Sequence, residues 1–120
     1  MKKFIFFFSA LVAISIFYSC KDEEPCATYE ADIKSIVDKS CAYSGCHSGA
    51  DAGMWVPADE ADYTNYDGLL NSLDNGSFAL EVIDSLTMPP FYVQDPHPKE
   101  LSQSELDIID CWIKDGYPKN

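Results

Sequence analysis

Two cysteines and a histidine stand within the seven residues "CAYSGCH", as Cys41, Cys46 and His47. Thiols can form covalent bonds or bind metals, and an imidazole is a common metal ligand. The chain must therefore fold this segment into a covalent attachment site, a metal site or a disulfide loop beside a histidine. The residues from 41 to about 61 are rich in Gly, Ser, Ala, Asp and Pro, which predicts a long loop.

The first residues have the pattern of an export signal. Lys2 and Lys3 precede an apolar run over 4–18, and a run this short with one charged flank is typical of a signal peptide, here 1–19. Cys20 follows, and the junction resembles the lipobox of bacterial lipoproteins, in which that cysteine carries lipid. Multiple acyl chains on one residue give stable membrane anchoring.

An acidic tether, residues 20–26, is predicted between the lipid and the folded part. Its "KDEE" resembles the tag that directs some lipoproteins to the outer face of the outer membrane. We therefore expect an exported outer-membrane lipoprotein on the periplasmic or the cell-surface face. A solvated charge run is the alternative interpretation of "KDEE".

The remaining residues, 27–120, suffice for one small domain with a thin core. From Cys20 onward the chain has six lysines, no arginine and 20 acidic residues, a net charge of −14. Nucleic acids and anionic lipids need a basic surface on their partner, so the charge excludes nucleic-acid binding. It favours partners with a basic surface, unless the acidity serves only solubility.

Apolar spacing predicts an all-α fold with long loops and no strand. Residues 27–40 place Tyr29, Ile33, Ile36 and Val37 on one helical stripe that ends near Ser40. Thr64 and Asp67 form a capping-box-like start for a helix that stops at Asn75 and Gly76. The following "SFALEVIDSL" predicts a short helix from Ser77 with inward-facing Leu80, Ile83 and Leu86.

The last helix has the clearest signals. Ser102 and Glu105 form a capping box, and Gly116 closes the helix. Its apolar stripe consists of Leu106, Ile109, Trp112 and Ile113.

The histidine directly after Cys46 is typical of covalent haem attachment, in which two cysteines bond the ring edge and the next residue ligates iron. Here four residues separate the cysteines instead of the usual two. Gly45 can adopt backbone angles closed to other residues, so the longer loop could bulge outwards. A zinc site from Cys41, Cys46 and His47 lacks a convincing fourth ligand. In an exported chain a Cys41–Cys46 disulfide also remains open.

Residues 27–120 resemble the class I cytochrome c family, in particular small lipoprotein cytochromes of outer-membrane systems. The resemblance runs in order through "IKSIVDKSCAYSGCHSG", "YTNYDGLLNSLDNGSF", "TMPP" and "LSQSELDIIDCWIKDGYPKN". It implies a small cytochrome c-like helical domain whose last helix packs across the first. It also implies haem c bonded to Cys41 and Cys46, with His47 and Met88 as axial iron ligands.

The resemblance further implies an electron-transfer protein rather than an enzyme, because both axial iron positions are filled. Its partners are expected to be redox proteins. The haem should offer apolar surface to Trp55, Phe78 and Trp112. If the first and last helices cross, Cys26 and Cys111 can form a disulfide, with Cys41 paired to either of them as the rival arrangement.

Other interpretations remain beside this one. A haem-free binding or structural module would pair Cys41 with Cys46 and Cys26 with Cys111. His97, between two prolines in a polar loop, is expected to be exposed, but as an iron ligand in place of Met88 it would make the haem bis-histidine. A ligand-binding enzyme would need an open iron position.

Overall fold

The computed structural model describes residues 24–120. The expected signal peptide, Cys20 and most of the tether lie outside the described residues. The described part is helical, as predicted, and its β-type pairing is a single isolated bridge between Ser48 and Asp62. Within residues 24–120 no helix is long and apolar enough to cross a membrane.

The first helix is built as predicted on one apolar stripe. Thr28 caps a π-helical turn, η1 (Tyr29–Ile33), which continues directly into α1 (Lys34–Ser40). The stripe is buried throughout, with exposed fractions of 0 to 8 % for Tyr29, Ile33, Ile36 and Val37. The helix ends at Ser40, so Cys41 is the first residue of the loop, as expected from the sequence.

The middle helix, α2 (Tyr66–Asp74), also stops where predicted, at Asn75 and Gly76. Its cap is Asn65 rather than Thr64, because the Asn65 side chain accepts the Gly68 amide at 3.0 Å. Thr64 instead donates both its amide and its hydroxyl to Asp62. The capping-box-like prediction was therefore wrong by one residue, although the helix that it marks is present.

The next helix differs from its predicted inward face. A short α3 (Ser77–Ala79) runs into a π-helical turn, η4 (Leu80–Asp84). Leu80 and Leu86 are 52 % and 62 % exposed, whereas Phe78 and Val82 are buried. Ile83 is half-buried and packs against the core, as predicted. The buried face thus runs through Phe78 and Val82 rather than Leu80, and Leu86 lies beyond the end of η4 with a φ of 52°, so it does not continue the helix.

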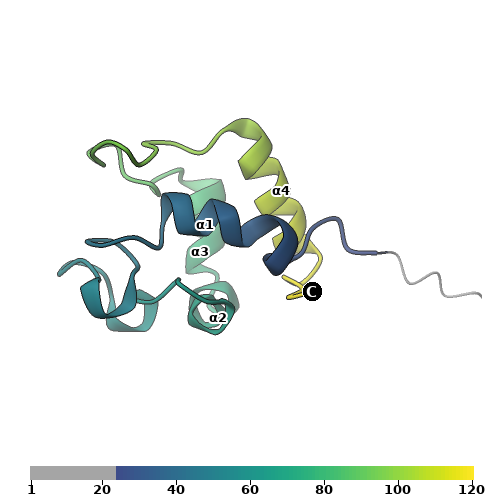
Figure 1. Ribbon diagram of the computed structural model, residues 1–120. Coiled ribbons are helices and arrows are strands. Elements are labelled where there is room, and N and C mark those ends of the chain that lie inside the picture. Colours follow the sequence, from purple (N-terminus) through teal and green to yellow (C-terminus); the bar gives the residue numbers. More distant parts are fainter. Residues whose placement is uncertain (1–23) are drawn as a thin grey trace, which may run out of the picture.

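The last helix, α4 (Gln103–Lys114), has the predicted capping box between Ser102 and Glu105. It lies across η1 (Figure 1), where the Trp112 and Tyr29 rings are 6.4 Å apart. The chain after α4 completes this contact, because Pro118 O accepts both the Tyr29 amide at 2.9 Å and Trp112 Nε1–H at 3.0 Å. The first and last helices thus form one packed unit.

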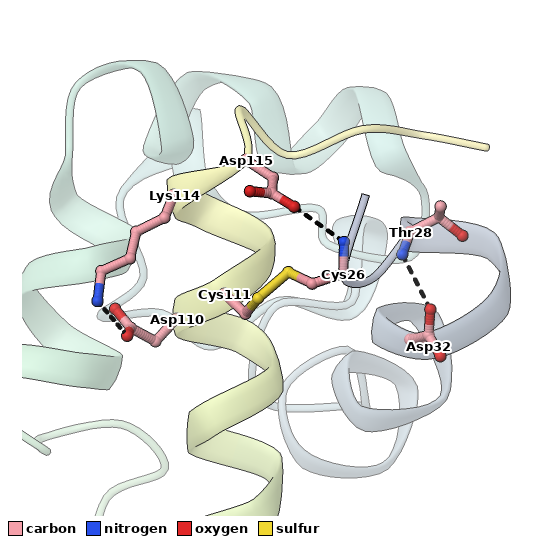
Figure 2. The surroundings of a disulfide bond; sticks show 7 residues. All are labelled: Cys26, Thr28, Asp32, Asp110, Cys111, Lys114 and Asp115. Carbon is pink, nitrogen blue, oxygen red and sulfur yellow. Dashed lines mark hydrogen bonds and ion pairs between the residues drawn. A yellow bond between two sulfur atoms is a disulfide. The ribbon is translucent and has the colours of Figure 1, made fainter. Parts of the chain in front are cut away.

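A disulfide fastens the segment before η1 to α4. Cys26 and Cys111 are bonded, with their Cα atoms 6.3 Å apart (Figure 2). The Asp115 carboxylate accepts the Cys26 amide at 2.9 Å beside it. This is the pairing that follows if the two helices cross.

Replacing both bonded cysteines, as Cys26→Ser with Cys111→Ser, should lower the free energy of unfolding by about 2–4 kcal/mol. The reason is that the bond closes a long loop and restricts the unfolded chain. Urea denaturation followed by circular dichroism measures the change. The exposed Lys114→Ala, which breaks the Lys114–Asp110 ion pair one turn from the disulfide, is the control and should cost no more than about 0.5 kcal/mol. Equal midpoints for the double variant and the parent would contradict the bond.

Two long loops lie at the same end of the molecule, opposite the chain segment that enters before η1 (Figure 1). One follows α1 and includes short 3₁₀ turns at Gly49–Asp51 and Ala58–Glu60. The other joins η4 to α4 over residues 85–102. The candidate residues of the first loop and Met88 of the second are therefore brought to one end of the fold.

Candidate functional site

The Cys41–His47 segment is a closed loop. The His47 amide donates to Cys41 O at 3.0 Å, and the Cys46 amide donates to Tyr43 O at 2.9 Å. Gly45 adopts a φ of 85°, a left-handed conformation that favours glycine. The four residues between the cysteines are thus accommodated by a turn, with Gly45 in the role expected from the sequence.

Backbone contacts from residues 51–53 hold this loop from outside. Gly45 donates its amide to Asp51 O at 2.8 Å, and Gly53 donates to Cys46 O at 3.0 Å. Gly53 lies so close that an added Cβ would be 2.4 Å from Gly45 O. A side chain at position 53 would therefore displace the backbone of the loop between the two cysteines.

Gly53→Ala should destabilise the protein by about 1–3 kcal/mol, because backbone and not a flexible side chain must move to admit the new methyl group. Hydrogen exchange at the Gly45 and Gly53 amides should accelerate in the variant. Ser44→Ala, at an exposed position in the same loop, is the control and should stay within about 0.5 kcal/mol. A Gly53→Ala protein with unchanged stability and exchange would show that the loop does not need this close approach.

His47 is buried and its ring orientation is fixed from two sides. Its Nδ1 is hydrogen-bonded to the backbone carbonyl of Glu60, and its ring stacks on Tyr63 with 4.1 Å between centroids and 2° between planes. The Tyr63 amide in turn donates to His47 O at 2.9 Å. A carbonyl only accepts, so Nδ1 carries a proton, and Nε2 is the ring nitrogen whose lone pair the neutral imidazole can offer. This is the arrangement that metal-ligating histidines adopt.

Of the cysteines within residues 24–120, Cys41 and Cys46 are free and half-buried. Burial, with a smaller contribution from neighbouring Cys46, raises the pKa of the Cys41 thiol to about 12. Cys41 is therefore a protonated thiol at neutral pH. The haem-free interpretation expected a Cys41–Cys46 disulfide, and among the described residues the disulfide present is Cys26–Cys111 alone.

One cavity of about 730 Å³ brings the predicted site residues together. Its wall includes Cys41, Cys46 and His47 from the first loop and Met88 from the second. The volume lies in the range typical of small-molecule and cofactor sites. The buried apolar part of its wall consists of Tyr63, Phe78, Val82, Pro89 and Val93.

The other methionine near the site lies elsewhere. Met54 is 85 % exposed and is not part of the cavity wall, whereas Met88 is half-buried and packs against the core. Of the described methionines, Met88 is therefore the one that can present its thioether to a group in the cavity. Whether Met88 is a ligand, as the sequence resemblance implies, stays a prediction.

The three aromatic residues expected around the site have different positions. Phe78 and Trp55 both lie on the cavity wall, although Trp55 is 90 % exposed. Trp112 is not on that wall but is fully buried between Tyr29 and Tyr117. The expectation that Trp112 packs at the site was wrong, because the crossing of η1 and α4 encloses its ring first.

His97 was expected to be exposed, and the structure corrects this. It is half-buried on the cavity wall, its ring is stacked on Tyr43, and its Nδ1 lies 3.2 Å from Lys39 O. Its position between two prolines in a polar stretch gave no sign of these contacts. They arise because the 85–102 loop folds back over the end of α1.

The cysteine and histidine ligand atoms do not form a compact metal cluster. Over residues 24–120, the one group of three potential ligands within 4.8 Å of each other is Cys26, Cys111 and Asp115. Cys26 and Cys111 are bonded to each other, so their sulfurs are committed. The ligand atoms of Cys41, Cys46 and His47 are spread along the cavity wall, which disfavours a tetrahedral zinc site made from them.

The wall residues fit a flat, apolar iron porphyrin. Two thiols, an imidazole whose Nε2 can offer a lone pair and a thioether all border one largely apolar cavity. The sequence identified these four residues but missed Glu60 and Tyr63, which orient His47. The Glu60 contact uses a backbone carbonyl, which no sequence pattern marks, and Tyr63 lies in a stretch with loop composition.

Comparison of the chain with protein families, with curated proteins and with solved structures finds no match.

Proposed function

We propose that this protein is an electron-transfer protein with one haem c, bonded covalently to Cys41 and Cys46. His47 and Met88 are the proposed axial ligands. The observation that supports this most strongly is that all four residues border one cavity and that the Nδ1 of His47 is engaged by Glu60 O. The packing of α4 across η1 also agrees with a cytochrome c-like domain over residues 27–120.

The side chains have separate tasks in this proposal. Haem iron bound there would accept and release one electron at a time. Cys41 and Cys46 would hold the ring: the S–H of each thiol would add across a vinyl double bond to give a thioether, so that attachment would need no oxidant. The contacts of His47 with Glu60 and Tyr63 fix its ring and engage Nδ1, which leaves Nε2 as the nitrogen that would bind the iron. Met88 offers a thioether, which stabilises ferrous iron relative to a second imidazole and raises the potential.

The proposal excludes enzyme chemistry at the iron. With His47 and Met88 both engaged, no axial position is left for a substrate. Electron exchange requires only that the ring edge come near a partner. The site margin carries the exposed Trp55 and Tyr92, so the cavity lies open to the surface.

The charge of the chain supports a basic partner. The whole sequence has a net charge of −12, and it contains no arginine. Electrostatic steering would therefore bring redox proteins with a basic docking surface to it and repel nucleic acid. The proposed lipid on Cys20 would hold the domain at the outer membrane, on its periplasmic or cell-surface face.

The test uses the full chain, exported in a host that matures c-type cytochromes. The expected product is red, has a Soret band, and has the mass of the processed, lipidated polypeptide plus one haem after denaturation. The oxidised protein should show the weak near-infrared absorbance of thioether–iron ligation. The reduced protein should not bind carbon monoxide under native conditions. A colourless product with the mass of polypeptide and lipid alone would overturn the proposal and leave a haem-free helical module. A red product without the near-infrared band would instead exclude Met88 as ligand.

A further inference from the structure

Two rings connect the loop of Met88 to the loop between the cysteines. Tyr43 and His97 are stacked face to face, with 3.4 Å between centroids and 1° between planes. His97 Nδ1 lies 3.2 Å from Lys39 O, and because a carbonyl only accepts, Nδ1 donates. His97 thus contacts both the last turn of α1 and the cysteine loop.

The rest of this loop is held mainly at its beginning. The Thr87 and Met88 amides both donate to Glu81 O, at 2.9 and 3.2 Å. Farther along, the Val93 and His97 amides donate to Pro90 O and Gln94 O, which are bonds within the loop itself. Apolar burial of Val93 and Leu101 also holds the far half. Between these two anchors, the contacts of His97 with Lys39 and Tyr43 join the loop to the end of α1 and to the cysteine loop.

The unusual spacing of the cysteines places Tyr43 for this contact. Tyr43 is one of the four residues between Cys41 and Cys46, and its carbonyl accepts the Cys46 amide in the turn. Its hydroxyl is buried beside Cys46, and burial together with this neighbour raises the pKa of Tyr43. The contact with His97 is made by the Tyr43 ring.

We propose that the Tyr43–His97 stack is a latch that positions Met88 as the axial ligand, and that the two extra residues between the cysteines serve to provide it. Tyr43 and His97 are positioning residues in this inference, which rests on the proposed function. Without the stack, the loop would sample more conformations and Met88 would leave the iron more often.

Tyr43→Ala removes the latch, and Tyr43→Phe keeps the ring and deletes only the hydroxyl beside Cys46. The first readout is hydrogen exchange of residues 91–98 in the full chain, which does not depend on haem. An aromatic pair of this kind predicts an increase of about two- to tenfold in Tyr43→Ala and no increase in Tyr43→Phe. His97→Ala should match Tyr43→Ala, and the double variant should add little, because both single changes remove the same contact.

The second readout is the iron ligation itself. Tyr43→Ala and His97→Ala should keep covalent haem but lose part of the near-infrared thioether–iron band and admit carbon monoxide. Tyr43→Phe and His97→Phe, which retain a stacked pair, should resemble the parent. Far-UV circular dichroism checks that the variants are folded. The phenylalanine variants keep the test valid if an alanine variant does not fold.

The outcomes separate the latch from the proposed function. A red parent whose Tyr43→Ala variant keeps its near-infrared band and its exchange rates would overturn the latch and leave the proposed function intact. If the His97→Phe variant loses the iron-ligation absorbance that the parent protein shows, His97 is the iron ligand. This result would also overturn the latch. A colourless parent would overturn the proposed function and with it any role in placing Met88, even if exchange in Tyr43→Ala still rose.

Discussion

Haem attachment will be abolished when Cys41 and Cys46 are both replaced by alanine, and it will survive when Cys26 and Cys111 are both replaced. The first pair is free and borders the cavity, whereas the second is joined in a disulfide that does not border it. The haem-stained gel of the denatured, exported protein measures covalent attachment. Because each double variant replaces two cysteines, each is the matched control of the other.

The single variants divide the attachment between the two sulfurs. Cys41→Ala and Cys46→Ala should each retain haem through one thioether, with a shifted absorbance because one vinyl group remains. Colour retained in Cys41→Ala and lost in Cys46→Ala would show attachment through Cys46 only. Colour retained in the Cys41→Ala, Cys46→Ala double variant would contradict the covalent site altogether.

Replacing Trp112 by alanine will be the most damaging single change in the core. Trp112 is fully buried, packs against the rings of Tyr29 and Tyr117, and donates its Nε1–H to Pro118 O at 3.0 Å. Removing the ring leaves a cavity and deletes one of the two hydrogen bonds that Pro118 O accepts, which should lower the free energy of unfolding by about 3–5 kcal/mol. For a domain of marginal stability, much of the protein would be unfolded at 37 °C.

The control is the other tryptophan. Trp55 is 90 % exposed, so Trp55→Ala should change the free energy of unfolding by no more than about 0.5 kcal/mol. Trp112→Phe should fall between the two, since it keeps most of the apolar ring and loses the hydrogen bond. Urea denaturation followed by circular dichroism compares the three. Similar losses for Trp55→Ala and Trp112→Ala would contradict the packing of α4 on η1.

The features that the sequence predicted well are those that depend on near neighbours along the chain. The buried stripe of η1 and α1, the capping box of Ser102 and Glu105 and the stop at Gly76 each follow from spacings of three or four residues or from one backbone angle. In α3 and η4, where Phe78 and Val82 form the buried face, the predicted inward Leu80 was found exposed.

For the site, the sequence by itself determined the kinds of group present. It placed two thiols beside an imidazole and set a thioether on a stretch stiffened by Pro89 and Pro90, which is enough to predict the chemistry. It could not determine which of these groups would meet, because that depends on how the loops after α1 and η4 fold toward each other.

Only the tertiary structure decided that Met88 and not Met54 borders the cavity, that Trp112 belongs to the helix crossing, and that His97 stacks on Tyr43. It also supplied the Glu60 carbonyl that orients His47. These contacts join residues far apart in the chain or use backbone atoms that every residue possesses. Neither kind of contact leaves a local pattern in the sequence, since each is selected by packing of the whole domain.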